Sequence, residues 1–137
     1  MKDIMKYFII IFHILLGLLI IFLNINNLLH IATLTTQNTD KQYYYGISLL
    51  QGFVEATLGI LLGLCSVVGA VAFRKDKRWA VPLLPIVTLI TIMAAVRSLI
   101  RAGGLVAGPT ALVVIILSIF LIVEILYITL RKQKQTN

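Results

Sequence analysis

The chain has 137 residues, of which 60% are hydrophobic and only 12% are charged, and its mean hydropathy is +1.02. An average soluble domain has about 25% charged residues, so this composition excludes an ordinary soluble protein. A net charge of +7 would suggest nucleic-acid binding in a soluble chain. Here, however, the basic residues flank apolar stretches, where they fix membrane orientation and contact anionic lipid. We therefore expect the lipid bilayer as a partner and no nucleic acid.

Four apolar stretches are each long enough, at about 1.5 Å rise per residue, to cross a hydrocarbon core of about 30 Å. They predict an all-α, polytopic integral membrane four-helix bundle, formed by residues 1–137 as a single transmembrane domain. The first stretch is longer than the apolar core of a signal peptide and lacks a small-x-small cleavage site, so we interpret it as an uncleaved span. The predicted spans are approximately residues 7–29, 47–73, 80–100 and 106–130.

The placement of lysine and arginine predicts the orientation. Basic residues precede the first span, separate the second from the third and follow the fourth. The connection from Ile31 to Gln42 has only Lys41, which Asp40 offsets, and the connection from Ala102 to Pro109 has no charge. By the positive-inside rule, both termini are cytoplasmic, and we expect a multi-pass protein of the bacterial cytoplasmic membrane. The basic residues are Lys2, Lys6, Arg74, Lys75, Lys77, Arg78, Arg131, Lys132 and Lys134.

A stripe of small residues runs along the second span at alternating steps of four and three. At about 100° per residue, such residues fall on one narrow face of a helix. Helices in lipid are held together by close backbone approach over small residues, so the stripe predicts a packing seam. Its partner is either a helix of the same chain, which the short connections favour, or a second copy in a homodimer. The seam consists of Gly52, Ala56, Gly59, Gly63, Ser66 and Ala70.

Polar residues inside the spans carry the functional hypotheses, because a charge at the bilayer centre costs at least about 2.5 kcal/mol. Counted at helical rise, Glu55 and Arg97 both lie about 25 Å above the cytoplasmic boundary. Asn24 reaches a similar level, with Gln51 in or just above this layer, and Arg101 lies one helical turn above Arg97. These five residues form a candidate ligand or ion site. The alternative is structural: Glu55 and Arg97 only lock two helices, and the arginines extend to the outer headgroups.

A second polar level lies nearer the cytoplasmic side. His13 is 7 residues after Lys6, and Glu124 is 7 residues before Arg131, which places each about 10 Å from the boundary. The first and fourth helices could meet there, so His13 and Glu124 form a candidate proton site. The alternative interpretation is a structural histidine and a carboxylate that is hydrated near Arg131.

Motifs of common enzymes and metal sites are absent from the sequence. It contains no HExxH, no paired Cys/His spacing, no serine nucleophile elbow and no glycine-rich phosphate loop after a strand. Cys65 is the single cysteine, which excludes an internal disulfide, and we interpret it as a packing residue. The sequence therefore predicts no enzyme activity, no metal and no cofactor.

Three segments resemble the small four-helix bacterial membrane proteins of the broad DoxX-like group. They are the runs from Val54 to Gly63, from Ala95 to Gly104 and from Val123 to Leu126. The resemblance implies a compact four-helix bundle in the cytoplasmic membrane, and some members of the group are subunits of membrane redox systems. The first helix differs from the group pattern because it lacks an early arginine and a glycine-rich start. A redox role is therefore not carried over.

These observations predict a small multi-pass membrane protein that acts by binding or association in the cell membrane. One alternative is a small proton-coupled transporter or efflux protein that uses Glu55 and Arg97, with Glu124 and His13 as further candidates. Four-helix multidrug exporters have a carboxylate in the first helix, whereas the first span here has no Asp or Glu. The other alternative is a membrane immunity protein or accessory subunit that docks on a membrane-protein partner.

Overall fold

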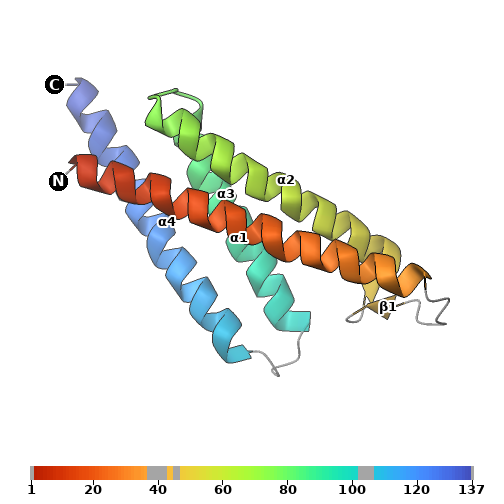
Figure 1. Ribbon diagram of the computed structural model, residues 1–137. Helices are drawn as coiled ribbons and strands as arrows, with labels where there is room; N and C mark the ends of the chain where they lie inside the picture. Colours follow the sequence, from red (N-terminus) through yellow and green to blue (C-terminus); the bar gives the residue numbers. More distant parts are fainter. Residues whose placement is uncertain (1, 37–42, 45–46, 102–106, 137) are drawn as a thin grey trace. The chain divides into compact units, whose positions relative to one another are not determined.

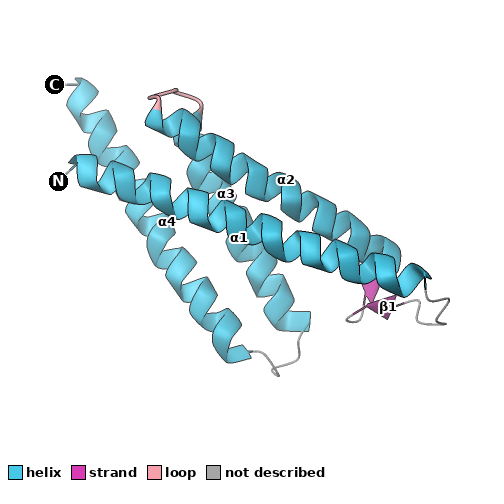
Figure 2. Ribbon diagram, viewed as in Figure 1, coloured by secondary structure: helices cyan, strands magenta, loops and turns pink. Residues whose placement is uncertain are grey.

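The computed structural model describes residues 2–36, 43–44, 47–101 and 107–136. The predicted all-α class is confirmed over these residues, which form four helices and one short hairpin (Figures 1 and 2). Strands β1 (Tyr43–Tyr44) and β2 (Ile47–Ser48) pair antiparallel, with Tyr43 opposite Ser48 and Tyr44 opposite Ile47. The helices are α1 (Lys2–Thr36), α2 (Leu49–Arg74), α3 (Ala80–Arg101) and α4 (Ala107–Thr136).

Each helix contains a segment that is long and apolar enough to cross a membrane, which confirms the four predicted spans by length and composition. The second span begins two residues later than predicted, because Ile47 and Ser48 belong to β2. Ser48 is placed as the N-cap of α2, since its hydroxyl oxygen accepts a hydrogen bond from the amide of Gln51 at 3.2 Å. The predicted start at residue 106 lies outside the described residues. The four segments are Asp3–Leu34, Leu49–Arg74, Ala80–Arg101 and Gly108–Lys132.

The chain divides into two compact units, which we describe separately. Unit 1 consists of Met1–Ile11 and Gly69–Asn137, and unit 2 consists of Phe12–Val68. Unit 1 therefore contains the beginning of α1, the end of α2, and the whole of α3 and α4. Unit 2 contains most of α1 and α2 together with the hairpin. The sequence-based assignment of a single transmembrane domain stays a prediction.

In unit 2, α1 and α2 approach each other closely over glycine. A Cβ atom added to Gly63 would lie 2.7 Å from the carbonyl oxygen of Gly17, and one added to Gly17 would lie 2.6 Å from the carbonyl oxygen of Gly63. Both glycines are buried. Such distances leave no room for a side chain, so the two backbones are in contact here. For this part of the predicted seam, the packing partner is a helix of the same chain.

In unit 1, α3 and α4 lie side by side, and aromatic and branched side chains fill the interior. The rings of Phe73 and Tyr127 meet edge to face with centroids 5.8 Å apart, and Phe8 contacts Phe120 at 5.7 Å. A Cβ atom on Gly69 would lie 2.8 Å from the side chain of Leu84, so α2 also approaches α3 closely. The outward faces carry large apolar residues, as expected for helices in contact with lipid.

Candidate functional site

Burial separates the polar residues within the helices into two groups. His13, Ser66, Thr88 and Glu124 are buried, each at most 1% exposed. In the candidate outer layer, Gln51, Arg97 and Arg101 are exposed, whereas Asn24 and Glu55 are half-buried. The enclosed polar groups therefore belong to the inner level that the sequence assigned to His13 and Glu124, and not to the outer layer.

Sequence reasoning missed Thr88 and assigned Ser66 only to the packing seam. Thr88 is 8 residues after Ala80, where α3 begins, and Ser66 is 8 residues before Arg74, where α2 ends. At helical rise, each lies about 12 Å from the basic end of its own helix, which is close to the level of His13 and Glu124. The same count along every helix would have identified both residues from the sequence.

His13 and Ser66 join α1 to α2 inside unit 2. The hydroxyl of Ser66 donates a hydrogen bond to the backbone carbonyl oxygen of His13 at 2.9 Å, and Nδ1 of His13 lies 2.9 Å from the same hydroxyl oxygen. A serine hydroxyl has one proton, and here that proton is directed to the carbonyl. Nδ1 must therefore donate to the serine oxygen, which means that it carries a proton. In a neutral imidazole, the one ring proton is then on Nδ1 and not on Nε2.

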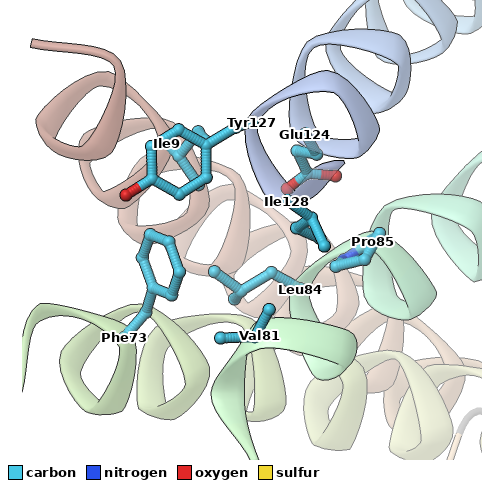
Figure 3. A pocket seen from close by; sticks show the side chains of 8 residues that line it. All are labelled: Ile9, Phe73, Val81, Leu84, Pro85, Glu124, Tyr127 and Ile128. Carbon is cyan, nitrogen blue, oxygen red and sulfur yellow. The ribbon is translucent and has the colours of Figure 1, made fainter. Parts of the chain in front are cut away.

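Glu124 lies beside a small cavity within unit 1 (Figure 3). The cavity has a volume of about 10 Å³, which is room for about one water molecule. Pro85 lines it and has no amide proton, so it cannot donate the helical hydrogen bond to the carbonyl of Val81, which also lines the cavity. Glu124 and Tyr127 supply the polar side chains of a lining that is otherwise apolar. The lining residues are Ile9, Phe73, Val81, Leu84, Pro85, Glu124, Tyr127 and Ile128.

The predicted pairs between helices fall on different units. His13 belongs to unit 2 and Glu124 to unit 1, and the same division separates Glu55 from Arg97. Both pairings therefore stay predictions. Within α2, the side-chain amide of Gln51 donates to the Glu55 carboxylate at 3.1 Å, which brings two residues of the outer layer together.

Asn24 is part of the helix contact in unit 2. Its side-chain amide donates to the carbonyl of Ile20 at 2.8 Å, and a Cβ atom on Gly59 would collide with the Asn24 side chain. Asn24 therefore packs on the small-residue seam of α2, where glycine makes room for it. This contact is compatible with a structural role and gives no direct support to ligand binding.

An ion cluster at the basic end of unit 1 is a further polar feature that the sequence reasoning did not single out. Nζ of Lys6 donates to both carboxylate oxygens of Asp76 at 2.9 Å, and Nη2 of Arg131 donates to Oδ1 at 3.4 Å. These contacts connect α1, the turn after α2, and α4. The hydrogen bonds from the Lys6 ammonium lower the pKa of Asp76 below its ordinary value.

The turn that carries Asp76 is a Schellman motif at the end of α2. The amide of Lys77 donates to the carbonyl of Ala72 at 3.0 Å, and the amide of Asp76 donates to the carbonyl of Phe73 at 3.1 Å. Asp76 occupies the left-handed position of the motif, with φ of 55°. Glycine or asparagine is usual there, and aspartate tolerates this conformation better than most other residues do. An aspartate among four basic residues was the signal available in the sequence.

Metal binding finds no support in the described part of the chain, where no three His, Cys, Asp or Glu side chains are grouped to hold an ion. Comparison of the chain with protein-family models, with curated proteins and with solved structures found no match. The resemblance to the DoxX-like group therefore stays a prediction.

Proposed function

We propose that the protein is a multi-pass protein of the cell membrane that acts by binding to or associating with another membrane component. The observation that carries this proposal is the exposure of large apolar side chains on all four helices. The cavity at Glu124 has room for about one water molecule, whereas the helices expose large apolar side chains along their length. On α4, for example, Ile115, Ile116, Ile119 and Ile122 are each at least 55% exposed. Such surfaces suit contact with lipid and with other membrane helices.

Docking on one specific protein, as an immunity protein or accessory subunit does, is the narrower form of this proposal. A proton-coupled transporter is the second candidate, and the burial of Glu124 favours it. A carboxyl group inside a membrane helix is costly and often marks a proton or ion path. Arg97 is exposed, so we base the transporter hypothesis on Glu124 and no longer on the outer pair of Glu55 and Arg97.

A photo-crosslinking amino acid placed at Ile119 tests association in intact cells. Ile119 is 58% exposed on α4, and Leu117, which is 3% exposed on the same helix, is the control position. We expect position 119 to form one protein adduct of defined mass and position 117 to form none with another protein, because only the exposed face can meet a partner. Adducts with lipid alone, from exposed positions on all four helices, would contradict association.

Proton uptake by reconstituted vesicles that Glu124→Gln abolishes would then favour the transporter.

We also propose that the membrane is the bacterial cytoplasmic membrane and that both termini are cytoplasmic. In a Cys65→Ser background, Thr36→Cys should react with an impermeant thiol reagent in intact cells. Lys75→Cys should react only after permeabilisation, because it lies among the basic residues expected on the cytoplasmic side. Labelling is read on gels by mass shift. Reaction at position 75 in intact cells would reverse the proposed orientation.

A further inference from the structure

The basic end of unit 1 gathers far more positive charge than its carboxylates balance. Asp76 accepts hydrogen bonds from Lys6 and Arg131, so a single carboxylate is shared by two cations. Figure 1 shows the beginning of α1, the turn after α2 and the end of α4 at the same end of this unit. Five further cations there are exposed, and Asp3 is the one other acid in these described segments. The exposed cations are Arg74, Lys75, Lys77, Arg78 and Lys132.

Of the two cations on Asp76, only Arg131 has donors left for a ligand, because Nζ of Lys6 donates to both Asp76 oxygens and, at 3.5 Å, to the carbonyl oxygen of Arg74. Arg131 uses Nη2 on Asp76 at 3.4 Å, which is a long hydrogen bond, while its Nη1 is buried without a hydrogen-bond partner among the described residues. A guanidinium has five N–H donors, and an ammonium has three. A guanidinium with unused donors suits phosphate oxygens, which accept several charge-assisted hydrogen bonds at once.

Exposed apolar and aromatic side chains lie next to these cations in the sequence. Ile4 is 72% exposed, Tyr7 58% and Trp79 52%. Aromatic rings such as those of Tyr7 and Trp79 are favoured at the boundary between headgroups and acyl chains. A ligand that combines a phosphate group with apolar chains would contact both features, whereas a free phosphate ion would contact only the cations.

We propose that the basic end of unit 1 binds the headgroup phosphate of an anionic phospholipid, with Arg131, held in place by Asp76, as a donor and Lys6 as a neighbouring positive charge. The exposed cations of the turn and of α4 add attraction that favours an anionic headgroup over a zwitterionic one. The acyl chains then lie along the exposed apolar side chains of α1 and α3.

Trp79 makes the proposal measurable, because it is the one tryptophan in the sequence and immediately follows Arg78. The full-length protein is reconstituted into phosphatidylcholine vesicles that contain either brominated phosphatidylglycerol or brominated phosphatidylcholine, with the bromine close to the headgroup. Bromine quenches indole fluorescence at short range. We expect more quenching by the phosphatidylglycerol at equal mole fraction, so the ratio of the two quenching efficiencies exceeds one. Lys6→Gln and Arg131→Gln should lower this ratio toward one.

A matched double variant separates a local site from the effect of net charge. Lys75→Gln with Lys77→Gln removes two exposed charges at the proposed site, and Arg97→Gln with Arg101→Gln removes two exposed charges from the other end of α3. Only the first double variant should lower the ratio, and it keeps the test valid if Lys6→Gln or Arg131→Gln fails to fold. Equal quenching by the two lipids in the unmodified protein, or equal losses in the two double variants, would overturn the proposal. Added inorganic phosphate at constant ionic strength should leave the ratio unchanged, and a fall to one would assign the donors to free phosphate instead.

Discussion

Gly63→Leu is expected to lower the free energy of unfolding in detergent by about 1–3 kcal/mol or more, the range seen when extra volume is forced into a packed interior. The reason is the contact between α1 and α2 in unit 2. A Cβ atom at position 63 would lie 2.7 Å from the carbonyl oxygen of Gly17 and 2.7 Å from the side chain of Ile21. The backbone of α1 cannot change its rotamer to avoid the clash, as a flexible side chain can. The helices must therefore separate, and they lose packing along the contact.

Two other glycines provide a graded control for this prediction. Gly59→Leu should destabilise less than Gly63→Leu, because its Cβ meets the side chain of Asn24, which can rotate away. Gly108→Leu should have little effect, since a Cβ atom there meets nothing within 4 Å. Thermal unfolding in mild detergent, followed by circular dichroism, measures all three variants. Equal stability of the Gly63 and Gly108 variants would show that α1 and α2 are not in contact at this point.

The course of the helices could be read from the sequence because lipid imposes a simple rule. A spanning segment must satisfy its backbone hydrogen bonds internally and remain apolar, and uninterrupted apolar length reveals such segments directly. Their ends were less predictable. The start of α2 depends on the cap at Ser48 and on the pairing of Tyr44 with Ile47, which apolar length does not register.

Helix packing was predictable only where side-chain volume alone decides it. The glycines of α2 indicate close approach, but their partner Gly17 stands alone among larger residues of α1 and was not singled out. The candidate sites depended on rotation about the helix axis as well as on depth. Counting at helical rise gives depth, so it placed Arg97 and Glu124 along their helices. It does not give exposure, and Arg97 is exposed whereas Glu124 is buried.

Polar pairs formed by short side chains were also hidden in the sequence. The sequence predicted Ser66 as a small packing residue because its spacing matches that of the glycines. In the structure, its hydroxyl also donates a hydrogen bond to the carbonyl of His13 and accepts one from Nδ1 of His13. The two interpretations are compatible, since only a small side chain lets α1 approach closely enough for the histidine to reach it. In the sequence, Asp76 is only one acidic residue in a basic turn. Its role in joining three segments depends on a left-handed backbone conformation that spacing alone does not reveal.

Ser66→Ala is expected to lower the free energy of unfolding by about 1–2 kcal/mol, because it leaves the protonated Nδ1 of His13 buried without its acceptor. The matched control is Ser118→Ala. The hydroxyl of Ser118 donates at 2.7 Å to the carbonyl of Val114 within its own helix, so its removal breaks no contact between helices. We expect the control to unfold close to the unmodified protein. Denaturation in mixed detergent micelles, monitored by circular dichroism, gives both values.

A double-mutant cycle then isolates the hydrogen bond itself from the loss of packing. His13→Leu removes the group that the serine oxygen accepts from, so the effect of Ser66→Ala should be much smaller in that background. Coupling of this kind would show that α1 and α2 are held together by a polar contact as well as by glycine packing. If Ser66→Ala costs the same with and without the imidazole, the serine acts only through its small size. The inner polar level would then lose its link between α1 and α2, and the assignment of the ring proton of His13 to Nδ1 would lose its basis.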